Sequence, residues 1–269
     1  MQLPSFWNKR KPETHKGDYG HALLVAGSYG RMGCAILAAR ACMRSGVGLL
    51  TVHAPERGVN PLQVAVPEAM ASIDYDGFLF ANVPQGLKKY NALGVGPGIG
   101  TAERTFLALH SLLTGWGERP VVLDADALNI VAAHKDELLP LISGHSIVTP
   151  HDREYQRLFG DERPNRMASR YGITVVRKGY RTRVYAPDES EYENNTGNPG
   201  MASAGSGDVL TGVVLALLAQ GLKLYEAACT AVYIHGMAGD LAVNKQSQAS
   251  IMAGDIVENL KNVGMIDGF

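Results

Sequence analysis

Three small residues, Gly205, Ser206 and Gly207, stand directly before Asp208, and an apolar segment of helical length begins at Val209. Because glycine has no side chain, such a loop lets several backbone N–H groups approach one ligand. The N-terminus of the following helix adds unpaired N–H groups and a partial positive charge. Together these features predict an anion hole that holds phosphate.

Asp208 lies at the junction of this loop and the helix. A carboxylate beside a phosphoryl group in transfer can act as a general base and take the proton of the attacking hydroxyl. Aspartate is also a preferred N-cap residue, so a helix cap is the alternative interpretation. The small residues before Asp208 favour the catalytic base.

The composition is that of an ordinary globular protein. The chain has 269 residues, of which 46% are hydrophobic and 19% charged, and its net charge is −1. This length suits one large α/β domain or two small ones, and we expect a single domain over residues 1–269. The near-zero net charge gives no reason to expect a nucleic-acid partner.

Cysteine usage and hydropathy indicate the cytoplasm. Cys34, Cys42 and Cys229 show no metal-ligand spacing, so we expect reduced, buried thiols and no disulfides. No apolar run reaches transmembrane length, and residues 1–16 have no signal-peptide core. We therefore expect a cytoplasmic protein with no membrane partner.

Short apolar runs alternate with helical segments, which predicts a mostly parallel central sheet with helices on both faces. The expected strands cover residues 21–27, 49–53, 91–95, 120–124, 146–149, 173–176 and 182–185. The expected helices cover residues 34–45, 101–113, 127–133, 209–219, 224–244 and 253–263, with further helical stretches between 153 and 171. Ligands bind beyond the carboxyl ends of such strands, where this chain places glycine and polar residues.

The glycines at 94–100 follow one of these strands. They resemble a dinucleotide fingerprint only weakly, because Pro97 interrupts the pattern and the glycine spacing is wrong. A tight turn is the alternative, but we favour close backbone approach to a ligand, with Gly98 as the best candidate.

Two further rim segments carry side chains that could do chemistry. Asp124 and Asp126 could orient a substrate group or a Mg²⁺-bound water, or one of them could cap the next helix. His151 follows Pro150 at a predicted helix start, which favours contact with a ligand. Six other histidines have no such context, and no functional role is predicted for them: His21, His53, His110, His134, His145 and His235. Arg40 and Arg44 could contact phosphate, although a solvated helix face is favoured.

No Walker A sequence is present, so a bound nucleotide must be held by a different loop or motif. The run Lys178-Gly179-Tyr180-Arg181-Thr182 follows a predicted strand and could hold an adenine nucleotide through its backbone and Lys178. Alone, this run is better explained as a hairpin turn at Gly179.

Taken together, these stretches resemble the ADP/ATP-dependent NAD(P)H-hydrate dehydratases of the ribokinase-like superfamily. The ordered set of matching pieces covers nearly the whole chain from about residue 14. It consists of 16–20 with Gly27-Ser28, 32–35, 44–48, 96–98, 124–129, 149–151 and 195–208. Many family members carry a Pro-Gly pair where this chain has Asp152-Arg153. This difference affects the expected shape of that loop and not the family assignment.

The resemblance implies an enzyme that returns hydrated NADH or NADPH (NADHX, NADPHX) to the normal coenzyme, with ADP or ATP as phosphoryl donor and Mg²⁺. It implies that Ala35, Gly98, His151 and Asp208 contact the hydrate, with Asp208 as the base. It implies that Gly207 and the run 178–182 hold the adenine nucleotide. No protein ligands to a metal are predicted.

In the implied mechanism, Asp208 deprotonates the ring hydroxyl, the oxygen attacks the terminal phosphate, and phosphate then leaves. The resemblance also implies a homotetramer that acts beside a separate NAD(P)HX epimerase. Two alternatives stay open: a small-molecule kinase of the same superfamily, such as a hydroxyethylthiazole kinase, and a nucleotide-binding protein without turnover.

Overall fold

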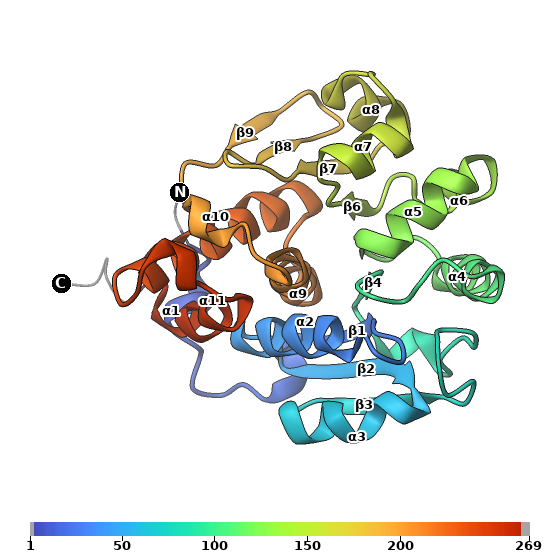
Figure 1. The fold of residues 1–269 in the computed structure, drawn as a ribbon, viewed down its shortest axis with the longest axis horizontal. Helices are drawn as coiled ribbons and strands as arrows, with labels where there is room; N and C mark the ends of the chain where they lie inside the picture. Colours follow the sequence, from blue (N-terminus) through green and yellow to red (C-terminus); the bar gives the residue numbers. More distant parts are fainter. Residues whose placement is uncertain (1–2, 265–269) are drawn as a thin grey trace.

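One nine-stranded sheet forms the centre of the molecule (Figure 1). A computed structural model describes residues 3–264. The strands are β1 (His21–Val25), β2 (Leu49–Pro55), β3 (Met70–Asp74), β4 (Ala92–Val95), β5 (Val121–Leu123), β6 (Ser146–Val148), β7 (Thr174–Arg177), β8 (Arg183–Tyr185) and β9 (Glu191–Glu193). Their order is β3-β2-β1-β4-β5-β6-β7-β8-β9. Strands β1 to β7 pair in parallel and the last two pairings are antiparallel, which confirms the mostly parallel sheet.

Helices cover both faces of this sheet, as predicted (Figure 1). The helices are α1 (Ser5–Asn8), α2 (Met32–Arg44), α3 (Glu56–Ala65), α4 (Glu103–Trp116), α5 (Ala125–Ala133), α6 (Lys135–Ile142), α7 (Asp152–Phe159), α8 (Pro164–Tyr171), α9 (Ser206–Ala219), α10 (Leu224–Val243) and α11 (Ala253–Asn259). Ala22 and Leu24 of β1 pack with α2, α9, α10 and α11, whereas Leu23 and Val25 pack with α4 to α8. This alternation follows from the two-residue period of a strand.

Four elements were not predicted: α3, β3, α6 and β9. Pro61 lies inside α3 and Pro140 inside α6, and an internal proline argues against a helix. Strand β3 is an edge strand that is mostly not buried, and β9 has the polar sequence Glu-Tyr-Glu, so neither contains an apolar run. Hydrogen bonds to β2 hold β3, and hydrogen bonds to β8 hold β9. The helices α3 and α6 are held by packing, α3 against β3 and α6 against α4.

Helix α9 lies close above the middle of the sheet and against α2. A Cβ atom added to Gly212 would come 2.1 Å from the carbonyl oxygen of Ala38 on α2. A Cβ atom added to Gly94 of β4 would lie 3.0 Å from Leu215 of α9. Glycine at these two positions therefore allows α9 to lie close to α2 and to β4. This close packing also fixes the position of the residues at the N-terminus of α9.

We expect Gly212→Ala to lower the free energy of unfolding by about 1–3 kcal/mol, because the two helix backbones must move apart. Gly254→Ala in α11 is the matched control, since an added Cβ there meets nothing within 4 Å. That control should be neutral or stabilising by about 1 kcal/mol, because alanine favours helix more than glycine does. Urea unfolding measures both variants, and equal stability of the two would contradict this packing argument.

Candidate active site

Asp208 lies in the first turn of α9, and Gly205 is the N-cap residue of that helix. Gly205 has φ of 89°, a left-handed conformation that favours glycine, and no side chain caps the helix. The cap interpretation of Asp208 is therefore not supported. Burial raises the pKa of Asp208 to about 6, and the charges of Asp124 and Asp126 add to this, while a hydrogen bond from Cys34 and the charge of Lys178 oppose it.

Asp124 and Lys178 form an ion pair beside Asp208. The Lys178 Nζ atom lies 2.6 Å from Asp124 Oδ1, and Thr211 Oγ1 donates to Asp124 Oδ2 at 2.7 Å. Lys178 Nζ is also 3.7 Å from Glu154 Oε2. Burial lowers the pKa of Lys178, but the Asp124 and Glu154 carboxylates outweigh it, so the net shift is upward and Lys178 stays charged.

These contacts bear on the alternatives for the Asp124 strand end. Asp124 is the N-cap residue of α5, but its side chain makes no capping hydrogen bond; its two oxygens accept from Lys178 and Thr211, and contact with a substrate group or a Mg²⁺-bound water stays a prediction. Asp126 lies inside α5 and accepts a hydrogen bond from the Gly100 backbone N–H at 2.8 Å, so its side chain does not cap the helix either. It also lies 3.7 Å from Arg31.

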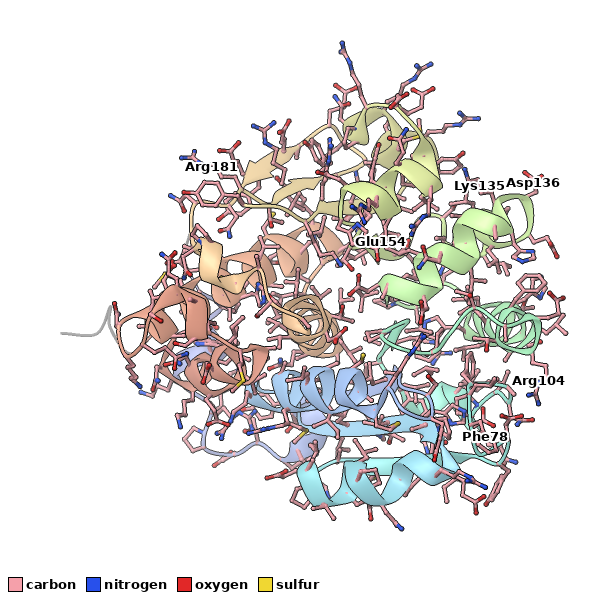
Figure 2. The ribbon with its side chains drawn as sticks, viewed as in Figure 1. Phe78, Arg104, Lys135, Asp136, Glu154 and Arg181 are labelled. Carbon is pink, nitrogen blue, oxygen red and sulfur yellow. The ribbon has the colours of Figure 1, made fainter. Side chains whose placement is uncertain are left out.

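A cavity of about 700 Å³ opens on one side of α9. The predicted nucleotide residues that line it are Lys178, Gly179, Tyr180, Thr182 and Gly207, together with Ser206 of the predicted anion hole. His151, predicted to contact the hydrate, lines the same cavity. The predicted hydrate contacts Ala35, Gly98 and Asp208 are not part of this lining, and neither are the predicted phosphate and nucleotide residues Gly205 and Arg181. Gly205 lies directly before Ser206, and Arg181 pairs with Glu193 of β9 at the upper left of Figure 2.

His151 is fixed by a capping box at the start of α7. Its Nδ1 atom accepts hydrogen bonds from the backbone N–H groups of Arg153 at 3.1 Å and Glu154 at 3.2 Å. The Glu154 carboxylate accepts in return from the backbone N–H of His151, and Glu154 lies near the centre of the view in Figure 2. The chain thus starts a regular helix at Asp152-Arg153, where many family members carry a Pro-Gly pair, and the capping box fixes the His151 ring.

Cys34 of α2 lies near Asp208 and against Gly98, and Asp208 and Cys34 each shift the pKa of the other. A Cβ atom added to Gly98, whose φ is +66°, would lie 3.1 Å from Cys34 Sγ. Burial raises the pKa of Cys34 to about 12, and the negative charge of Asp208 contributes, so Cys34 is a neutral thiol. Ala35 has no exposed surface and packs beside Gly27, so the predicted contact of Ala35 with the hydrate stays a prediction.

The predicted rim is thus assembled at the carboxyl ends of the strands. Asp124 follows β5, Lys178 follows β7 and Gly98 lies in the turn after β4. Asp208 directly follows Gly207 of the cavity lining, and it influences the pKa of Cys34, which packs against Gly98; we call these two residues the Gly98–Cys34 corner. A base beside the cavity can take the proton of an acceptor that attacks a phosphoryl group held there.

Sequence reasoning missed His235, which it treated as background. This α10 residue lines the cavity, and its Nε2 atom lies 3.3 Å from the Ser206 hydroxyl. Burial lowers the pKa of His235 to about 4, so the ring is neutral near pH 7. Nothing in the local sequence around residue 235 indicates this contact, because only the packing of α10 against α9 creates it.

Arg40 and Arg44 lie on the solvated face that the sequence favours for them, with side chains 39% and 45% exposed, and both pair with Glu258 of α11. The cysteines are free thiols as predicted, but Cys34 is only partly buried. In the part of the chain that the structure describes, no group of three or more His, Cys, Asp or Glu side chains could hold a metal ion. Within residues 3–264, no helix has the length and apolar character needed to cross a membrane.

The fold defines the class of protein. A ribokinase-like superfamily protein from Enterococcus faecalis superposes with a TM-score of 0.83 at 26% identity, over 94% of this chain and 89% of that one. The ADP/ATP-dependent NAD(P)H-hydrate dehydratase of Bacillus subtilis, co-crystallised with ATP/Mg²⁺, superposes with a TM-score of 0.80 at 31% identity, over 94% and 92% of the two chains. A hydroxyethylthiazole kinase from Pyrococcus horikoshii shares the fold alone, at 14% identity. The chain is a ribokinase-like protein.

The sequence places it in one family of that class. A family profile described as NAD(P)H-hydrate dehydratase matches residues 22–262. The ADP-dependent (S)-NAD(P)H-hydrate dehydratase of Neisseria meningitidis is 38% identical, over 95% of this chain and 88% of its own length. This chain therefore belongs to the NAD(P)H-hydrate dehydratase family. It spans about half, 52%, of a bifunctional NAD(P)H-hydrate repair enzyme from Moorella thermoacetica.

Proposed function

We propose that this protein dehydrates (6S)-NADHX and NADPHX to NADH and NADPH at the expense of ADP or ATP. One observation carries the proposal: Asp208, with its pKa raised to about 6, lies in the first turn of α9 directly after Gly207, which lines a cavity of about 700 Å³. Family membership supplies the substrate class. A base whose pKa lies near the working pH is suited to proton transfer in both directions.

The adenine nucleotide occupies the cavity beside α9. Its terminal phosphate lies at the backbone N–H groups of Gly205, Ser206 and Gly207, where the helix N-terminus favours negative charge. Lys178 adds a positive charge close to Gly207, since its Nζ atom lies 3.4 Å from the Cβ position of that glycine. Binding there needs no Walker A loop.

The hydrate lies on the Gly98 side of Asp208. Asp208 accepts the proton of the ring hydroxyl, and the oxygen forms a bond to the terminal phosphorus as the bond to the leaving AMP or ADP breaks. The ring-nitrogen lone pair then expels phosphate to leave an iminium ion, and the neighbouring ring carbon loses a proton to water to restore the dihydronicotinamide. Phosphate leaves far more readily than hydroxide, which is why a phosphoryl donor is needed.

Mg²⁺ fits this site as a companion of the nucleotide. In the described part of the chain no cluster of protein ligands converges, and each oxygen of Asp124 accepts one hydrogen bond from a protein group. Mg²⁺ commonly keeps several waters and binds through substrate phosphates. The ion supplies neutralisation of the phosphate charge, and the protein supplies Lys178 and the α9 amides.

We further propose that residues 1–269 form one domain, that the chain assembles as a homotetramer, and that a separate NAD(P)HX epimerase supplies the reactive epimer. The bifunctional relatives, named as repair enzymes, support a functional link to a second activity. Free thiols at all three cysteines support a reducing compartment, the cytoplasm.

Return of the reduced coenzyme tests the proposal. The protein is incubated with (6S)-NADHX, Mg²⁺ and ADP, and NADH absorbance and AMP are followed together. We expect one AMP for each NADH formed, and no reaction without nucleotide. Phosphorylation of hydroxyethylthiazole without NADH formation would favour the kinase, and calorimetric ADP binding without any product would favour a protein without turnover.

A further inference from the structure

Two exposed aromatic side chains stand together near the carboxyl ends of β1 and β3. Tyr29 is 63% exposed and Phe78 is 46% exposed. Their rings meet edge to face, with centroids 5.3 Å apart. The Arg57 guanidinium lies 4.4 Å above the Phe78 ring and 5.8 Å from the Tyr29 ring. We call Tyr29, Phe78 and Arg57 the aromatic platform; Phe78 projects at the lower right of Figure 2.

The loop that presents Phe78 is held firmly. The buried Asp74 carboxylate accepts hydrogen bonds from the backbone N–H groups of Ala81 at 2.7 Å and Asn82 at 2.8 Å. Burial raises the pKa of Asp74, but hydrogen bonds from His53, Asn82 and these N–H groups outweigh it and hold the net pKa far below the usual range. The backbone N–H of Tyr29 donates to the Phe78 carbonyl oxygen at 2.7 Å. The two rings are therefore pre-positioned although they lack cover, which is typical of a binding surface.

The platform is continuous with the active site. Arg31 follows Tyr29 and Gly30 in the loop before α2, and its carbonyl oxygen lies 3.2 Å from the Cβ position of Gly98. The side chain of Arg31 is exposed and only 3.7 Å from Asp126. Tyr29, Arg31 and the Gly98–Cys34 corner thus follow one another along the same edge of the sheet.

We infer that the aromatic platform binds the adenosine half of the hydrated dinucleotide, an inference that rests on the proposed function. The substrate has a hydrated nicotinamide end, a central pyrophosphate and a distal adenosine. With the nicotinamide end at Asp208, the pyrophosphate lies beside Arg31 and the adenine stacks on the Tyr29 ring. Base–aromatic stacking of this kind tolerates any base, because every base has a π-face.

Arg57 gives the platform a charge that suits NADPHX. Among the described residues, Arg57 forms no ion pair, and its guanidinium is already oriented by the Phe78 ring. An arginine fork matches the oxygens of a phosphate group. The geometry assigns Arg57 to the 2′-phosphate that distinguishes NADPHX from NADHX.

Steady-state kinetics with two hydrates test the adenosine assignment. Tyr29→Ala is expected to raise KM for NADHX about tenfold, with KM for ADP unchanged, because one stacking contact is lost. The hydrate of reduced nicotinamide mononucleotide lacks the adenosine half, so Tyr29→Ala should treat it as the wild-type protein does. Tyr29→Phe keeps the ring and should restore affinity for NADHX.

Tyr75→Ala is the matched control, because Tyr75 is an exposed tyrosine of the loop after β3 but is not one of the three platform residues. An equal loss of affinity for the full and the truncated hydrate would overturn the assignment. So would a change in solution mass caused by Tyr29→Ala, since a second copy of the chain would then cover the platform. If the wild-type protein turns over neither hydrate, the proposed function itself fails.

Arg57→Ala tests the phosphate assignment separately. We expect KM for NADPHX to rise about tenfold while KM for NADHX changes less than twofold, with partial rescue by Arg57→Lys. Equal effects on both substrates would show that Arg57 only supports the Phe78 ring and would overturn this part of the inference.

Discussion

Asp208→Asn is expected to lower kcat for NADHX dehydration by about a thousandfold, because the amide cannot take the hydroxyl proton. Asparagine keeps the size of the side chain, so the affinity for ADP should be nearly unchanged. Stopped assays of NADH formation give kcat, and calorimetry gives ADP affinity. A variant that keeps wild-type turnover would show that another group is the base.

The same substitution should stabilise the fold at neutral pH. A carboxyl pKa of about 6 in the folded protein, against an ordinary value of 3.8, means that ionised Asp208 costs the folded state up to about 3 kcal/mol. The cost is absent below the unfolded pKa, grows as the pH rises, and is complete above the folded pKa. Asp208→Asn should therefore raise the free energy of unfolding more at about pH 8 than at about pH 5.

Urea unfolding at the two pH values measures this gain. Asp126→Asn serves as the control, because it removes the charge of a neighbouring carboxyl that accepts a hydrogen bond from the Gly100 backbone N–H. If Asp208→Asn gives no greater stability at the higher pH, the carboxylate is not held in an unfavourable environment. A stability gain joined to a loss of turnover is the pattern expected of a catalytic group.

Asp124→Ala has the largest expected effect on stability. It leaves the Lys178 ammonium, whose side chain is only 19% exposed, without its 2.6 Å partner and removes the acceptor of Thr211. Removing one member of a buried ion pair costs about 3–5 kcal/mol. The double variant Asp124→Leu/Lys178→Met should recover most of this loss, because an apolar pair of similar volume removes both charges.

Thermal or urea unfolding compares the single and double variants. A single variant as stable as the wild-type protein would mean that the pair is hydrated in solution. A double variant no more stable than the single one would mean that the loss comes from the Thr211 hydrogen bond or from packing, not from the stranded charge.

Asp124 also changes the pKa of Asp208, and the pH dependence of kcat/KM measures this effect. For the wild-type protein we expect kcat/KM to fall as the pH drops through about 6, because the free enzyme must hold Asp208 ionised. The Asp124 charge raises the pKa of Asp208, so Asp124→Asn should move this acid limb to lower pH. An acid limb that moves to higher pH, or does not move, would contradict the electrostatic coupling of the two carboxylates.

Much of the fold can be predicted because its central strands and helices are buried. Strands such as β1 and β4 are short apolar runs ending at glycine, and α9 is apolar on all sides, so local patterns suffice. The elements at the edges of the sheet cannot be predicted in this way. Strand β9 is polar, and α3 carries an internal proline, so only tertiary partners define them.

The site residues likewise fall into those that local sequence predicts and those that it does not. Asp208 and the small residues before it can be found from the sequence, because a flexible loop running into an apolar helix is a local signal. The Lys178–Asp124 pair joins residues 54 positions apart, and His235 reaches Ser206 from another helix, so no local pattern contains them. The aromatic platform combines the loop after β1 with the loop after β3, a strand that the sequence does not predict.

A crystal structure of the Asp208→Asn variant with ADP, Mg²⁺ and NADHX tests the central claim most directly, because this variant should bind both substrates without turning them over. We predict the terminal phosphate against the backbone N–H groups of Gly205 to Gly207 and the ring hydroxyl beside position 208. Density for the adenylate outside the α9 cavity, or for the hydrated ring away from the Gly98–Cys34 corner, would contradict the account.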